Sequence, residues 1–150
     1  MGSYLYLPAF LILSFVPAIS IEKSTQDFPE EYTWKNRLLL IFSPTYETSQ
    51  SKEQVSLLME DLEGKSERDL LYFQITDNDV SELVSGKKID ASSSFIRKSF
   101  GVATQEFSIV LIGKDGGIKL KQNQVLQLDE LYGIIDAMPM RQAEINRKQK

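Results

Sequence analysis

The sequence FSIVLIGKDGGIKLK, residues 107–121, predicts two strands joined by a tight turn. Residues 109–112 are continuously apolar, as in a strand buried on both faces, whereas Ile118 and Leu120 alternate with lysines, as in a half-exposed edge strand. The Lys-Asp-Gly-Gly run between them supplies residues that tolerate positive φ in a hairpin turn. Because a strand buried on both faces needs cover on each side, the rest of the chain is expected to build a sheet with helices around it.

Two more apolar runs, residues 37–43 and 70–75, predict strands that complete this sheet. The stretch between them has a helical pattern, and a strand, helix and strand at this spacing form a right-handed crossover with parallel strands. Strand 37–43 then lies in the middle, between 70–75 and 109–112, and strand 118–121 forms an antiparallel edge. The sequence therefore predicts an α/β domain with a four-stranded mixed sheet.

The crossover helix is expected to begin with Ser49 or Ser51 as its N-cap, because hydroxyl side chains satisfy the free amides of a helix start. Gly64 is expected to end it, since glycine is favoured just after a helix. One apolar stripe of this helix would face the sheet, and it consists of Val55, Leu58, Met59 and Leu62.

Two further helices would complete the cover of the sheet. A long polar loop, residues 76–93, comes first and could hold a short strand or a helical turn. Ser92 or Ser93 would then cap a short helix over residues 94–100, and a last helix is expected over residues 128–138, closed by Pro139. The short helix is expected to turn Phe95, Ile96 and Phe100 toward the sheet and Arg97 and Lys98 outward.

This order of elements, βαβ, short helix, β-hairpin and helix, with helices on both faces of the sheet, resembles the thioredoxin-like fold in its minimal form. Four segments carry a closer resemblance: RLLLIFSP at 37–44, FGV at 100–102, VLIGKDGGIKL at 110–120 and LYGIIDAMPMR at 131–141. They are similar to a domain of unknown function found in exported bacterial proteins and in animal extracellular-matrix proteins of the sushi-repeat and coiled-coil-domain-containing groups. The resemblance covers about residues 35–141 and implies a thioredoxin-like or peroxiredoxin-like domain with antioxidant or adhesive roles and no established catalytic residues.

The redox site of thioredoxin-like proteins is missing from this sequence. Their catalytic dithiol or peroxidatic cysteine follows the first strand of the crossover, where this chain has SPTYETS at 43–49. Their cis-proline would fall near Glu106 or Phe107, but no proline occurs between Pro44 and Pro139. Thioredoxin or peroxidase activity therefore cannot be inferred from the fold.

Neither cysteine nor histidine occurs in the 150 residues, which excludes disulfides, thiol chemistry, zinc sites built on these residues and catalysis by imidazole. The formal net charge is -4, and an acidic protein of this kind is a poor nucleic-acid binder. We therefore expect a non-catalytic binding module without a cofactor, whose partner is a protein or a cell-surface component. The alternative is a small enzyme with an antioxidant-related or hydrolytic role, using Tyr46 or Thr45 with Glu106 or Glu47.

The candidate binding residues gather where the first strand of the crossover ends. Ser43, Thr45 and Tyr46 lie at this carboxyl end and beside a helix start, which favours anions. Arg97 would strengthen an anion site if it reached this loop. The contact surface is expected to consist of loop 43–49 and the approach to the hairpin, residues 103–107, which includes Glu106. Two interpretations stay open: a small pocket for an anion or a partner's backbone, or an ordinary polar loop whose hydroxyls cap the helix.

No metal site is expected from this sequence. Asp77, Asn78 and Asp79 could suggest a hard cation, but they lack the spaced acids, the glycine and the terminal Glu of a calcium loop. The hairpin glycines do not form a phosphate cradle either, because no Gly-Lys-Ser/Thr sequence follows them.

Residues 1–20 are expected to be a secretory signal, which would make the protein secreted or periplasmic. Residues 4–18 are uncharged and mostly apolar, and Ala18 and Ser20 are small residues of the kind that a signal peptidase reads. An uncleaved anchor is the alternative, although prolines interrupt a stretch that is already short for spanning a bilayer.

The remaining chain divides into three parts. Residues 21–36 form a polar lead-in that its aromatic side chains would attach to the domain, which spans residues 37–140. Residues 141–150 form a basic tail, expected to be a frayed, solvated end. Contact with a membrane is expected only through an uncleaved signal or, weakly, through this tail.

Overall fold

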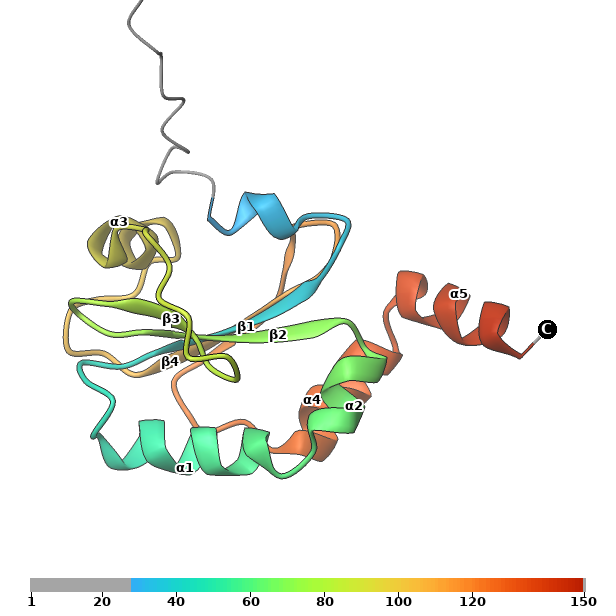
Figure 1. Ribbon diagram of the computed structural model, residues 1–150, viewed down its shortest axis with the longest axis horizontal. Coiled ribbons are helices and arrows are strands. Elements are labelled where there is room, and N and C mark those ends of the chain that lie inside the picture. The colour runs from blue at the N-terminus through green and yellow to red at the C-terminus, as the bar shows by residue number, and fades with distance from the viewer. Residues whose placement is uncertain (1–27, 150) are drawn as a thin grey trace, which may run out of the picture.

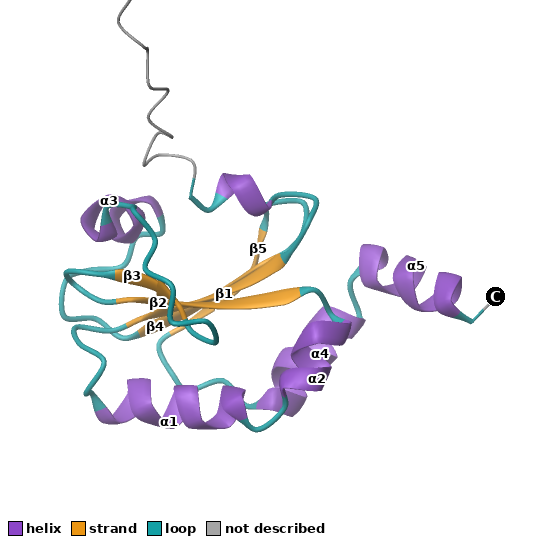
Figure 2. Ribbon diagram, in the orientation of Figure 1, coloured by secondary structure: helices purple, strands orange, loops and turns teal. Residues whose placement is uncertain are grey.

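The computed structural model describes residues 28–149, in which helices lie on both faces of one five-stranded sheet (Figure 1 and Figure 2). The strands run in the order β3-β2-β1-β4-β5. They are β1 (Arg37–Phe42), β2 (Leu70–Ile75), β3 (Val80–Glu82), β4 (Ser108–Ile112) and β5 (Ile118–Gln122). The helices are the 3-10 turn η1 (Glu30–Tyr32), α1 (Ser49–Met59), α2 (Leu62–Glu67), α3 (Ser93–Ser99), α4 (Leu128–Asp136) and α5 (Pro139–Lys148).

β1 is the central strand, as the sequence predicted. It pairs in parallel with β2 and antiparallel with β4, and β5 follows β4 as an antiparallel edge. The predicted count of four strands is wrong, because β3 adds a fifth strand that pairs antiparallel with β2. β3 has only three residues, too few for an alternating pattern, so its pairing with β2 defines it rather than its own sequence.

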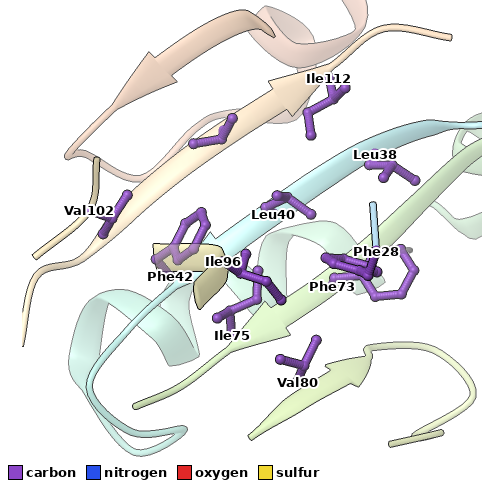
Figure 3. Close-up of a cluster of buried hydrophobic side chains, with 11 residues drawn as sticks. Phe28, Leu38, Leu40, Phe42, Phe73, Ile75, Val80, Ile96, Val102 and Ile112 are labelled. Atoms are coloured by element: carbon purple, nitrogen blue, oxygen red, sulfur yellow. The ribbon is translucent and has the colours of Figure 1, made fainter. Parts of the chain in front are cut away.

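The side chains of β1 alternate between two hydrophobic cores, one on each face of the sheet. Leu38, Leu40 and Phe42 belong to the first core, together with residues of β2, β3, β4 and α3 (Figure 3). Leu39 and Ile41 belong to the second core, with residues of α1 and α4. Every residue of β1 is buried, which explains why this strand reads as a continuous apolar run after Arg37.

The start and end of the crossover helix differ from the prediction. Thr48 is the N-cap of α1, and its hydroxyl accepts a hydrogen bond from the amide of Ser51 at 3.3 Å, so neither Ser49 nor Ser51 is the cap. Gly64 does not end the helix, since α1 stops before it and Gly64 lies inside α2. Asp61 caps this second helix and accepts from the Gly64 amide at 2.8 Å.

The buried face of α1 is more polar than the predicted apolar stripe. Leu58 is buried, but Met59 and Leu62 are 42% and 40% exposed. Buried Gln54 instead exchanges two hydrogen bonds with the backbone of Leu126: its Nε2 donates to the carbonyl at 3.0 Å, and the amide donates to its Oε1 at 2.7 Å. A buried amide side chain satisfied in this way connects α1 to the segment before α4.

The N-cap of α1 gives a first test of these assignments. Thr48→Ala is expected to lower the free energy of unfolding by about 1 kcal/mol, because the Ser51 amide loses its acceptor. Ser49→Ala, at the exposed first residue of the helix, should change it by less than about 0.5 kcal/mol. Urea unfolding of the two variants measures these changes. A larger loss of unfolding free energy for Ser49→Ala than for Thr48→Ala would mean that Ser49 is the N-cap.

The orientation of α3 is partly as predicted. Ser92 is its N-cap and accepts from the amide of Phe95 at 3.3 Å, and Ile96 is buried in the first core. The prediction is wrong for two other residues, because Phe95 is 51% exposed and Arg97 is only 4% exposed. Arg97 turns inward because carbonyl groups of three other segments surround its guanidinium.

The chain end is helical rather than frayed. α4 stops at Asp136, and Pro139 begins α5 instead of only closing the last helix. Proline suits this first position because its missing N–H would have no acceptor there. α5 continues to Lys148, so the predicted fraying is wrong for this segment. Arg141 in its first turn is buried, whereas most of the residues after it are exposed, as predicted for a solvated end.

An ion cluster attaches α5 to the sheet. The fully buried Arg37, at the start of β1, donates from both Nη atoms to the two carboxylate oxygens of Glu144, each at 3.2 Å. Lys114 of the hairpin donates to the same carboxylate at 2.8 Å. Lys114 also pairs with Asp69 at 2.7 Å, whereas Glu144 is the only carboxylate that pairs with Arg37 among the described residues.

The described part of the lead-in is held by aromatic contacts. The rings of Phe28 and Tyr32 lie 5.0 and 5.3 Å from the ring of Phe73, whereas Trp34 is 69% exposed. The predicted signal at residues 1–20 and the first part of the lead-in, 21–27, lie outside the described residues. Among residues 28–149, no helix has the length and apolar character needed to cross a membrane.

Candidate functional site

The predicted site lies where β1 and β2 end, and the structure brings Ser43 and Arg97 together there. Ser43 is fully buried, and its hydroxyl donates to the carbonyl of Thr45 at 2.9 Å and lies 3.4 Å from the hydroxyl of Ser51. This side chain therefore shapes the turn from β1 into α1.

Arg97 reaches this edge from α3 and binds the backbone of several segments. Its Nη2 donates to the carbonyl of Ser43 at 2.5 Å and to that of Ile75 at 3.3 Å. Its Nη1 donates to the carbonyls of Ala103 and Glu106 at 3.0 and 3.4 Å. The guanidinium thus joins the ends of β1 and β2 to the loop that leads into β4.

Asp77 lies in the loop after β2 and belongs to the site, although the sequence did not indicate this residue. Its Oδ1 lies 3.1 Å from Nη2 of Arg97, and its Oδ2 accepts from the side chain of Gln105 at 2.8 Å. Burial lowers the pKa of Arg97, and the charge of Asp77 opposes that effect. The acidic run at residues 77–79 was a visible signal, but it suggested a cation rather than an arginine.

Two buried atoms at this ion pair lack a hydrogen-bond partner within residues 28–149. They are Nε of Arg97, a donor, and Oδ1 of Asp77, an acceptor. The geometry of the contact between Oδ1 and Nη2 does not complete a hydrogen bond at Oδ1. Buried polar atoms are nearly always paired. This site can therefore still donate one hydrogen bond, from Nε, and accept one, at Oδ1.

A cavity of about 220 Å³, here called the Arg97 cavity, opens beside this pair. Arg97 and Asp77 line it, and Ser94, Lys98 and Thr104 contribute further polar side chains. The wall therefore comes from α3, the loop after β2 and the approach to β4. Of the predicted contact surface, loop 43–49 contributes nothing to this wall, whereas Ala103 and Thr104 of the approach 103–107 line it.

The other predicted site residues make hydrogen bonds within their own loops or, for Tyr46, with β3. Thr45 accepts from the amide of Glu47 at 3.3 Å, and the hydroxyl of Tyr46 lies 3.4 Å from that of Ser81 in β3. The carboxylate of Glu106 accepts from a backbone amide of its own turn at 2.9 Å. In the part of the chain that the structure describes, the carboxylates of Glu47 and Glu106 make no hydrogen bond to the hydroxyl of Tyr46.

The arrangement suits recognition of a neutral polar group. A guanidinium Nε can donate to a carbonyl oxygen, and a carboxylate oxygen can accept from an amide. Asp77 balances the charge of Arg97, and the exposed Lys98 adds one positive charge to the cavity wall. Among residues 28–149, no group of three His, Cys, Asp or Glu side chains is placed to hold a metal ion.

Comparisons with known proteins agree with this fold. A family model described as "Domain of unknown function (DUF4174)" matches residues 28–144. The reduced 2-Cys peroxiredoxin of Plasmodium vivax has a similar structure, with a TM-score of 0.56 and 18% identity over 77% of this chain and 84% of that chain. Thioredoxin peroxidase I of Plasmodium yoelii gives 0.56 and 17%, over 77% and 79%. At this identity the likeness concerns the fold alone, and the predicted thioredoxin-like fold is confirmed.

Proposed function

Because this chain belongs to the family described as a domain of unknown function (DUF4174), and has a thioredoxin-like fold without cysteine, we propose that it is a non-catalytic module that binds a partner protein at the Arg97 cavity. The observation that carries the proposal is that two buried atoms at the cavity make no hydrogen bond within the described residues, Nε of Arg97 and Oδ1 of Asp77. A peptide group presents the complementary acceptor and donor, its carbonyl oxygen and its amide.

The energetics favour such an occupant. A buried donor or acceptor without a partner costs about 1–3 kcal/mol, so a ligand that supplies both partners recovers this free energy on binding. A neutral peptide group does so without adding a charge to an ion pair that is already balanced. An anion offers acceptors but no donor for Oδ1 of Asp77, so the proposal takes the partner's backbone rather than the anion as the ligand.

Export is part of the proposal. The apolar stretch at residues 4–18, followed by small residues at 18 and 20, supports a signal that takes the protein out of the cytoplasm. A secreted or periplasmic module without cysteine needs no redox partner, and its partner would be a protein or another component of the cell surface.

Photo-cross-linking from position 104, an exposed residue at the cavity, tests the proposal in extracts of cells that make the protein. The full chain is expected to capture a partner, and Ala103→Trp is expected to abolish the capture. Ala103 lines the cavity and is exposed, so an indole there would occupy the space while Arg97 keeps its backbone contacts.

Ala143→Trp is the matched control, since Ala143 is an exposed alanine on α5. It should capture the same partner as the unmodified chain. Equal capture by both tryptophan variants would move the binding surface away from the cavity. A full chain that captures nothing would contradict a binding role.

A further inference from the structure

A second cavity, of about 180 Å³, lies where α5 begins, and we call it the α5 cavity. Its wall on the α5 side is apolar and consists of Met138, Pro139 and Met140. Arg37, the first residue of β1, lies on the other side, together with residues of the β4–β5 turn. Figure 1 shows α5 and α3 at opposite ends of the fold, so this cavity is separate from the Arg97 cavity.

Arg37 has one unused donor. Its Nη atoms are engaged, with Glu144 at 3.2 Å and with the carbonyl of Arg68 at 2.8 Å. Its Nε has no acceptor within the described residues, although the side chain is fully buried. A ligand in the cavity that offers an oxygen would supply the missing acceptor.

The start of α5 adds further donors at the same place. The helix has ten residues and begins without a side-chain cap at Met138. The amides of Met140 and Arg141 belong to the first turn, where a helix provides no acceptor of its own and where its dipole favours negative charge. The apolar wall and these donors therefore meet at one end of α5.

The charged side chains around the cavity are nearly balanced. Lys114 is paired with Glu144 at 2.8 Å, and Lys119 is paired with Asp115 at 2.7 Å. Side-chain charge alone thus does not select the ligand. The selection comes from the helix end and from the free donor of Arg37, which both favour an anionic oxygen.

We propose that the α5 cavity binds the carboxylate of a short apolar acid. One carboxylate oxygen accepts from Nε of Arg37, and the first-turn amides of α5 contact the group as well. The apolar body of the acid lies against Met138 and Met140. The volume of about 180 Å³ limits the ligand to a small molecule or to the end of a longer chain.

Titration of the ¹⁵N-labelled full chain with hexanoate tests this, because NMR spectra resolve the Nε–H of a buried arginine. Hexanoate is expected to shift the Arg37 Nε–H resonance and the amides of Met140 and Arg141 saturably. Hexanol, which has the same chain without the charge, should bind at least about tenfold more weakly. An unmoved Arg37 Nε–H, or equal affinity for the two probes, would overturn the proposal.

Two methionine variants provide the matched pair. Met140→Glu places a like charge in the wall at a residue that is already 38% exposed, and it should weaken hexanoate at least about tenfold. Met59→Glu, at a methionine of α1 that is 42% exposed, should leave the affinity unchanged. The same affinity in both variants would place hexanoate elsewhere on the protein. Neither the hexanoate titration nor the comparison of these variants depends on whether the Arg97 cavity binds a partner.

Discussion

Arg97→Met is expected to lower the free energy of unfolding by about 4 kcal/mol, the largest single effect that we anticipate. The side chain is 4% exposed and donates to carbonyls at the ends of β1 and β2 and in the loop before β4. Methionine fills a similar volume but leaves these carbonyls without that donor and Asp77 without its counter-ion. Both losses act on buried groups, where water does not compensate them.

The neighbouring residue supplies the control. Lys98→Met removes one positive charge from an exposed position of the same helix and should change the free energy of unfolding by less than about 0.5 kcal/mol. Arg97→Lys keeps the charge without the planar fork and should restore only part of the loss. Guanidinium unfolding of the three variants measures the effect. Equal midpoints for Arg97→Met and Lys98→Met would show that the buried contacts contribute nothing.

Glu144→Gln is expected to lower the free energy of unfolding by about 3 kcal/mol at neutral pH. The glutamine keeps the shape of the side chain but removes the charge that balances Arg37, while Lys114 keeps Asp69 as its partner. Arg37 is fully buried and cannot gain solvation in exchange. Glu53→Gln, on the exposed side of α1, is the control and should have almost no effect.

The same carboxylate makes the stability depend on pH. Burial alone would raise the pKa of Glu144, but hydrogen bonds from Lys114 and Arg37 outweigh it and hold the pKa below its usual value. A carboxylate whose pKa is lower in the folded state stabilises the fold above its unfolded pKa of about 4.3. This contribution is lost as the pH falls through the folded pKa. The difference between the unmodified chain and Glu144→Gln should therefore shrink below about pH 4, and a constant difference down to pH 2 would contradict the ion cluster.

Asp136 reinforces this acid sensitivity. Burial would raise its pKa as well, but hydrogen bonds from Arg68 and Arg141 hold the pKa below its usual value. Both lowered carboxylates connect the C-terminal helices to other segments. Acid is therefore expected to loosen α5 before the sheet, which hydrogen exchange at low pH would detect.

The sequence by itself determined the frame of the fold. Strands form in the predicted order from the apolar runs at 37–42, 70–75 and 109–112. The predicted glycine turn joins the last of them to the strand that begins at residue 118. These signals are local, because burial on both faces demands apolar residues along the strand itself and a tight turn demands glycine. The absence of cysteine was equally plain and excluded the redox chemistry of the fold.

Only the tertiary structure decided which polar residues are buried. Arg97 looked like an exposed helix residue, and its carbonyl partners come from strand ends and loops that the fold brings to it. Glu144 looked like part of a solvated tail, yet it lies more than one hundred positions from Arg37 in sequence and binds it directly. Such pairings depend on contacts between distant segments, and a side chain's type carries no record of its partner. Both cavities are likewise determined only by the tertiary structure, because the wall of each comes from segments that meet only after the chain has folded.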